Sequence, residues 1–212
     1  MTAARHIPIA DTVHTITIDS TFTPTPGGLI VQQGDTVNFQ NNSNSAITIQ
    51  FVPNPPGQPV SGNITINANS SGGFVAPNYD ASANYDIYVG TTKESDGPYA
   101  IQVGNGPIYV QVTWNVALGV GQTNPSPVAV PLEGNLEIFS TDTTSYKASW
   151  PNTGDPFTLP SPLKEVVPGV ANNLSYTATS AIAEYKFNLV KTTSSPVLGT
   201  GSGGGTVRVK GT

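Results

Sequence analysis

The sequence predicts an all-β protein that consists of two tandem β-sandwich domains with Greek-key connections. Its 22 Gly, 19 Pro and only 10% charged residues favour many short strands joined by turns over helices. Apolar residues alternate with polar ones in segment after segment, as in half-buried strands. Motifs also recur 100 positions later, so that Gly34 returns as Gly134 and Tyr85 as Tyr185. A repeat of this length suits a complete small domain, and we expect each copy to have its own core.

The first half of the chain carries the alternating pattern in a series of short segments. We expect strands at residues 14–18, 29–31, 36–39, 46–51, 62–68, 85–89, 99–103 and 108–112. A loop is expected at 23–28, and glycine-containing pairs mark turns at Gly72-Gly73, Asp96-Gly97 and Asn105-Gly106. About seven or eight short strands in each half are typical of a two-sheet sandwich.

The second half repeats this pattern from Asn115 to Lys210. Its clearest strands are expected at 137–139, 145–150, 174–177 and 185–190. The repeat matches 106–112 to 203–209, which makes 108–112 the last strand of the first unit. We therefore expect domains at 1–113 and 114–212, with Thr113 and Trp114 as a connection too short to be a flexible tether. Trp114 is expected either between the two units or inside one core.

Composition excludes several classes of function. The formal net charge is -5, and the eight Lys and Arg residues are scattered singly, so we expect no nucleic-acid partner. The chain has no Cys, which excludes disulfides, thiolate metal ligands and cysteine nucleophiles.

Targeting signals are also missing from the sequence. The run from Met1 to Asp11 contains no apolar stretch of about seven residues, so no secretory signal peptide is expected. No segment approaches the roughly 18 apolar residues of a membrane-spanning helix, and we expect no membrane insertion. The compartment stays unknown: the cytoplasm, export without a cleaved signal and a processed precursor all fit.

One stretch of the first half points to a known family. The residues from Leu29 to Asn42 form a strand, the turn Gly34-Asp35, a second strand and an Asn-bearing loop, and 46–51 follow as a further strand. This run resembles the cupredoxins, the family of blue-copper β-sandwiches. Residues 85–89 and 104–112 look like the family's later strands. The resemblance covers most of the first half and, more faintly, the second, and it implies tandem cupredoxin-like domains.

The ligands of that family do not carry over. Ser45, Ala46 and Ile47 stand around the position of its first copper-binding His, and Val89 and Gly90 stand where it places Cys. In the second copy, 141–150 and 189–205 contain no His, Cys or Met either. Because a blue-copper centre needs two imidazoles and a thiolate, we expect no copper and no other cofactor.

The two histidines, His6 and His14, are the only imidazoles of the chain. His14 begins an expected strand near Asp11 and could join Ser20 in a hydrolytic trio. No Gly-x-Ser-x-Gly elbow accompanies them, so we favour a surface or strand-end position for His14.

Two loops partly resemble ligand-binding loops, one for phosphate and one for calcium, but neither has the full pattern. The glycine-rich run 199–205 resembles a phosphate-binding loop, but the alternating residues 206–210 after it predict a strand instead of a helix, so we expect a mobile hairpin loop. Residues 93–97 gather two carboxylates beside a turn glycine but lack the spaced oxygen ligands of a calcium loop, so we expect an exposed turn.

An aromatic residue before Pro-Asn occurs in both copies, in 51–54 and 150–152. Phe51 and Trp150 are expected to plug one end of each sandwich. The alternative is a pair of aromatic platforms for sugars, whose duplication would raise avidity.

Taken together, these patterns predict a non-enzymatic binding or structural, self-assembling protein, with no catalytic, cofactor-binding or metal-ligating residues assigned. Its partner would be another protein or a copy of itself, with a glycan as the alternative in the form of a carbohydrate-binding or adhesive module. The alternatives of another class are a hydrolase that uses His14 and a protein that retains copper or calcium.

Overall fold

The computed structural model describes most of the first half of the chain and the main strands of the second. The described residues are 11–52, 62–94, 96–115, 120–124, 126–140, 145–149, 164–166, 176–177, 183–192 and 203–212. All regular structure in these ranges is strand, and none of them contains a helix long and apolar enough to cross a membrane.

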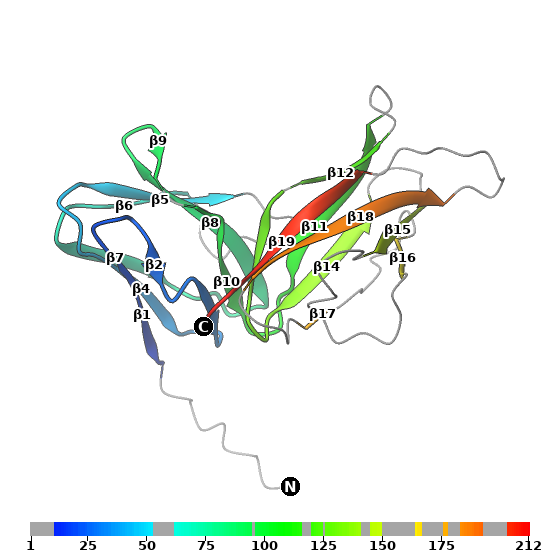
Figure 1. The fold of residues 1–212 in the computed structure, drawn as a ribbon. Coiled ribbons are helices and arrows are strands. Elements are labelled where there is room, and N and C mark those ends of the chain that lie inside the picture. The colour runs from blue at the N-terminus through cyan, green and yellow to red at the C-terminus, as the bar shows by residue number, and fades with distance from the viewer. Residues whose placement is uncertain are drawn as a thin grey trace, which may run out of the picture.

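The first half forms two facing sheets, which we name sheet A and sheet B (Figure 1). In sheet A the strands lie in the order β2 (Pro24–Thr25), β1 (Val13–Ile18), β4 (Thr36–Asn41) and β7 (Ser70–Val75). In sheet B the order is β3 (Gly28–Val31), β10 (Tyr99–Val103), β8 (Ala81–Val89), β5 (Ile47–Val52) and β6 (Ile64–Ile66), with β9 (Thr92–Lys93) paired to β8.

The second half repeats this arrangement in sheets C and D. Sheet C has the order β12 (Val120–Asn124), β11 (Ile108–Asn115), β14 (Asn135–Ser140) and β17 (Tyr176–Thr177). Sheet D has the order β13 (Val128–Pro131), β19 (Gly203–Lys210), β18 (Glu184–Thr192), β15 (Ser145–Ser149) and β16 (Lys164–Val166). The expected all-β fold with two β-sandwich units is confirmed, since the two pairs of sheets have the same strand order.

Strand pairing corrects the alignment of the two copies. β11 pairs parallel with β14 and antiparallel with β12, as β1 pairs with β4 and β2, so β11 is the first strand of the second unit. The expectation that 108–112 end the first unit is wrong, and β19 corresponds to β10. The boundary expected at 113/114 therefore cuts through β11, where Thr113 pairs with Gln122 and Trp114 with Gly121. The connection between the two units is therefore residues 104–107, which join β10 of sheet B to β11 of sheet C.

Two more expectations about local structure are wrong. Gly72 and Gly73 lie inside β7 instead of at a turn, because glycine lets β7 approach β4 closely. A Cβ built on Gly73 would lie 2.0 Å from the carbonyl oxygen of Val37. Within 199–205, expected to be a hairpin loop, residues 203–205 belong to β19 and pair with β18, and the remaining residues lie outside the described part.

Each unit has its own hydrophobic core, as expected. The first core gathers buried residues of sheets A and B, among them Ile16, Val37, Phe39, Tyr85 and Ile101. The second gathers residues of sheets C and D, among them Ile108, Val130, Leu136, Phe187 and Val207.

Two strands of sheet B are buried on both faces. β1 and β4 alternate between buried and more exposed residues, as strands with one wet face do. In contrast, every residue from Ala81 to Ile87 in β8 and from Tyr99 to Val103 in β10 is buried. Ala100 of β10 belongs to the core cluster of the second unit. The second unit therefore packs on the outer face of sheet B.

Candidate functional sites

The positions that hold copper ligands in the cupredoxins lie at one end of the first sandwich. The register of β5 against β8 places Thr48 opposite Tyr88, so one step further brings Ile47 opposite Val89. Ile47 is buried in the core, and no imidazole, thiol or thioether stands at these positions. The residues present do not fit a blue-copper ion. Nor do the described residues contain any group of three or more His, Cys, Asp or Glu side chains that could hold a metal ion.

A buried asparagine organises the loop at this end. Asn41 is fully buried, and its Nδ2 donates to the carbonyl oxygens of Ser45 at 2.8 Å and Asn67 at 3.0 Å. Its Oδ1 accepts from the backbone N–H and the hydroxyl of Ser43, at 3.0 and 2.7 Å. These side-chain hydrogen bonds, together with backbone bonds from Asn42 to Ile18 and from Asn69 to Ser43, hold the loop between β4 and β5.

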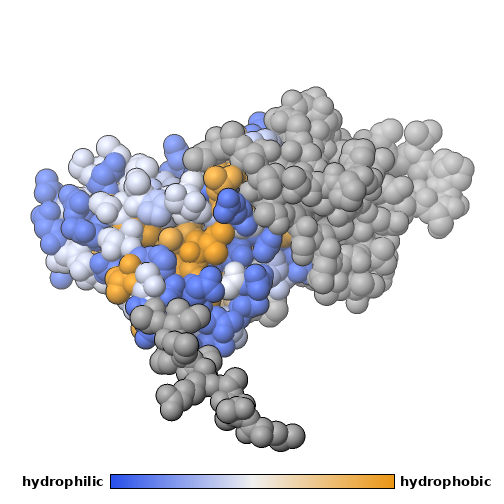
Figure 2. Space-filling model, turned by 90° about the horizontal axis from the view of Figure 1, so that it is seen from below, coloured by the Kyte–Doolittle hydropathy of each residue, from blue (hydrophilic) through white to orange (hydrophobic). Residues whose placement is uncertain are grey.

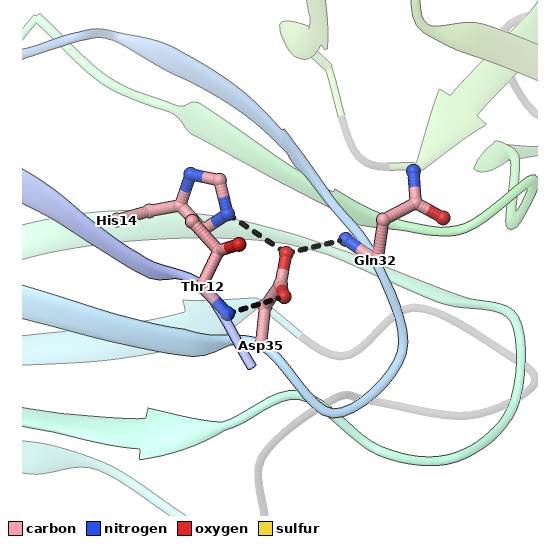
Figure 3. Close-up of polar contacts among 4 residues, drawn as sticks. All are labelled: Thr12, His14, Gln32 and Asp35. Atoms are coloured by element: carbon pink, nitrogen blue, oxygen red, sulfur yellow. Dashed lines mark hydrogen bonds and ion pairs between the residues drawn. The ribbon is translucent and has the colours of Figure 1, made fainter. Parts of the chain in front are cut away.

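His14 lies at the opposite end of the same sandwich, where it contacts Asp35 (Figure 3). Nε2 of His14 is 2.8 Å from Oδ2 of Asp35, a carboxylate that also accepts the backbone N–H groups of Thr12 at 3.0 Å and Gln32 at 2.9 Å. Burial alone would raise the pKa of Asp35, but these hydrogen bonds and His14 lower it. The carboxylate therefore ties the start of β1 to the turn before β4.

The hydrolytic trio expected as an alternative is not assembled. The hydrogen-bond partner of His14 is Asp35 and not Asp11, and Ser20 lies beyond the far end of β1 on the exposed surface. Residues six apart along an extended chain are separated by roughly 20 Å. His6 lies outside the described residues.

The turn considered for calcium is occupied by other interactions. Lys93 reaches Oδ1 of Asp86 at 2.8 Å. The backbone carbonyls of Asp96 and Gly97 accept from Nη1 of Arg208, the latter at 2.8 Å. These contacts draw the turn toward β19, and Glu94 is exposed.

The aromatic residue of the first copy is a core residue. Phe51 is 5% exposed and packs edge-on against Phe74, with ring centroids 6.0 Å apart, and against Tyr85 at 6.1 Å. It therefore plugs the sandwich and offers no platform to a sugar. Trp150 lies outside the described residues.

Hydrogen bonds from Asn84 to Ala129 and from Asn135 to Gln102 join the two units, and we call this contact the seam. Asn84 of β8 is 1% exposed, and its amide pairs with the backbone of Ala129 in β13. Nδ2 donates to the carbonyl of Ala129 at 2.9 Å, and Oδ1 accepts its N–H at 3.1 Å. Oε1 of the buried Gln102 accepts the N–H of Asn135 at 2.8 Å. Side-chain amides of sheet B thus hydrogen-bond to backbone groups of the second unit.

An open cleft of about 370 Å³ lies between Asp96 of the first unit and the strands β18 and β19 of the second. Arg208 spans it, since Nε contacts Oε2 of Glu184 at 3.0 Å while Nη1 reaches the first unit. Nζ of Lys210 sits 4.7 Å from the ring centroid of Tyr99. Burial lowers the pKa of Lys210, Arg208 lowers it further, and Asp96 and Glu184 oppose the shift. Arg208, Glu184 and Lys210 thus each have a partner at this cleft.

Among known proteins, similarity to this chain was found only with solved structures. No protein-family model and no curated protein matches the chain. A solved structure of an amicyanin variant in its reduced Cu(I) form is similar, with 15% identity over 47% of this chain and 87% of that chain and a TM-score of 0.35. The multicopper oxidase mgLAC shows 14% identity over 95% of this chain and 86% of its own, with a TM-score of 0.36.

A Cu-containing nitrite reductase from Thermus scotoductus SA-01 is similar at 14% identity, over 95% of this chain and 62% of that chain, with a TM-score of 0.30. All three are copper proteins by their descriptions, and TM-scores of 0.30 to 0.36 report a likeness without carrying an argument. The two-sandwich fold itself follows from the strand pairing, and likenesses of this size transfer no metal, substrate or activity to this chain.

Sequence reasoning missed the residues of the seam. Asn84 and Gln102 lie at polar positions of alternating strands, where the pattern predicts a solvent-facing side chain. Nothing local distinguishes them from Gln50, a polar residue on the same face of sheet B that is exposed. The burial of Asn84 depends on a segment 45 residues away.

Proposed function

We propose that this chain is a non-enzymatic binding or structural protein, a stiff pair of metal-free sandwiches whose surfaces engage another protein or a copy of itself. The observation that carries the proposal is the pairing of the Asn84 amide with the backbone of Ala129. Buried hydrogen bonds of this kind are costly to break, because each partner would be left unsatisfied away from water. The two units are therefore expected to move together.

The surface supports the same proposal. Only 10% of the residues are charged, and the coloured residues in Figure 2 are mostly hydrophilic, with hydrophobic residues exposed chiefly near the centre of the view. The outer face of sheet A carries no charged side chain: its rows hold Val13, Thr15, Thr17, Thr36, Asn38, Gln40, Ser71, Gly73 and Val75. Weak charge lowers the repulsion that otherwise keeps proteins monomeric.

Light scattering over protein concentrations from about 1 µM to about 1 mM tests the proposal, because this span covers weak to moderate affinities. We expect the mean mass to rise with concentration toward an ordered assembly. A strict monomer over the whole range, in a protein that also captures no partner, would contradict the proposal.

Two further measurements separate the alternatives. Specific binding on a glycan array would favour the carbohydrate-binding module instead. For the hydrolase, a measured turnover lost on His14→Ala would contradict the non-enzymatic proposal, and we expect no turnover in either protein, because Ser20 lies at the other end of β1 from His14.

A further inference from the structure

β7 differs from the other terminal strands of the sheets. It spans six residues at the end of sheet A, and among the described strands none pairs with its outer edge. The terminal strands β2, β6, β16 and β17 have two or three residues each. The edge of β3 is hydrogen-bonded to the C-terminal residues, since the N–H of Gly28 donates to the carbonyl of Gly211 at 2.8 Å. The edge of β13 is hydrogen-bonded to the side chain of Asn84. β12 lies against β18 and β19.

β7 also lacks the usual protections of an edge strand. Such strands avoid pairing with other chains through charged side chains, proline, bulges or short length. The sequence from Ser70 to Val75 contains no charged residue and no proline, and its register against β4 runs without interruption over six residues. The two central glycines leave no side chain to obstruct a neighbouring strand.

The exposed residues of this strand are suited to burial by a partner. Val75 is 64% exposed and stands in one row with Thr36 and Val13, which is itself 65% exposed. Figure 1 shows β7 on the side of the first unit that faces away from the strands of the second. β6 of sheet B contacts β7 at its inner face, where Ile66 lies beside Gly72, and no described strand pairs with its outer edge.

The uncharged edge and the symmetry of antiparallel pairing favour a second copy as the occupant. Two copies each carry a formal charge of -5 and repel one another, so contact is least unfavourable where neither presents charge. β7 is such a place. An antiparallel pair of identical strands also satisfies two-fold symmetry, the commonest symmetry of homodimers.

We infer that β7 is the self-association edge of this protein, where two copies pair antiparallel about a two-fold axis and join their A sheets into one continuous sheet. The inference rests on the proposed function and specifies its surface. Backbone N–H and C=O groups supply the affinity, while the cover gained by Val75 adds an apolar contribution.

Ser71→Lys tests the inference against Thr15→Lys as a matched control. Both residues are exposed on the outer face of sheet A, but Ser71 lies on the edge strand and Thr15 on β1, inside the sheet. Each variant adds the same charge to the same face. Sedimentation velocity should show self-association that is at least about tenfold weaker for Ser71→Lys and close to wild type for Thr15→Lys.

The outcomes separate this inference from the proposed function. If wild type and both variants associate equally, β7 is not the edge that pairs, although the proposed self-assembly stands. If Thr15→Lys weakens association as much as Ser71→Lys, the contact involves the face or the charge and not the edge. If the wild type stays monomeric, the inference falls together with the self-assembling form of the proposed function.

Hydrogen exchange gives a second measurement that does not depend on a variant. Amides of β7 should become protected as the concentration of the wild type rises, while the single exchangeable amide of β2, that of Thr25 at the opposite end of sheet A, should not. Unchanged exchange in β7 in an associated sample would overturn the inference.

Discussion

Replacing Asn84 by Leu removes the amide that joins the two units while keeping a side chain of similar size. The change abolishes two hydrogen bonds and leaves the N–H and C=O of Ala129 unpaired at a buried position. An unsatisfied buried group costs about 1–3 kcal/mol, so the two together should cost about 2–6 kcal/mol. This is a large fraction of the roughly 5–15 kcal/mol by which folded proteins are stable.

Urea unfolding followed by two probes measures the effect. Both tryptophans, Trp114 and Trp150, belong to the second half of the sequence, whereas far-ultraviolet circular dichroism reports on both halves. In the wild type we expect the two transitions to coincide, because the seam couples the units. In Asn84→Leu the midpoint should fall, and the transitions should separate as the units lose their coupling.

Gln50→Leu is the matched control, since it makes the same kind of change on the same face of sheet B at an exposed position. Its stability should stay within about 0.5 kcal/mol of wild type. An Asn84→Leu protein with the midpoint and slope of the wild type would refute the reasoning, because the seam would then contribute nothing to the coupling.

Three other substitutions probe the first unit. The Tyr85 hydroxyl is buried without a hydrogen-bond partner among the described residues, so Tyr85→Phe should raise the free energy of unfolding by about 1 kcal/mol, and a lower urea midpoint would contradict this. Because the pKa of Asp35 is lowered below its usual 3.8, its stabilisation is present above that pH and lost as the pH falls through the folded value. The difference in urea midpoint between wild type and Asp35→Asn should therefore shrink from pH 7 to about pH 3, and a constant difference would show that ionisation of the carboxylate is not involved. Gly73→Ala should destabilise the fold by about 2 kcal/mol or more, because its Cβ would lie 2.0 Å from the Val37 oxygen, and thermal unfolding at the wild-type temperature would show that β7 moves away freely.

Local features of the chain predict much of the fold. The alternation in residues 14–18, 36–39 and 99–103 marks strands that the structure contains, since period two follows from the pleat of a single strand. The missing copper chemistry is equally local, because the absence of Cys excludes a thiolate ligand wherever the chain folds.

The errors concern partners that lie far apart in the sequence. Residues 108–112 alternate like any other strand, so their membership of sheet C became apparent only from pairing with β14. Gly72-Gly73 has the composition of a turn, yet β7 runs straight through it because β4 leaves no room for a side chain. His14 and Asp35 are 21 positions apart, and only the parallel pairing of β1 with β4 brings them together.

The amino-acid order alone thus establishes the duplication, the β-sheet character and the absence of a thiolate copper ligand, because each depends on residue type or on neighbours within one strand. The packed chain alone establishes which polar positions are buried in the seam and which edge of a sheet is left open. Those outcomes depend on contacts between residues of separate units. The alternating pattern of the sequence is the same around Asn84, which is buried, as around Gln50, which is exposed.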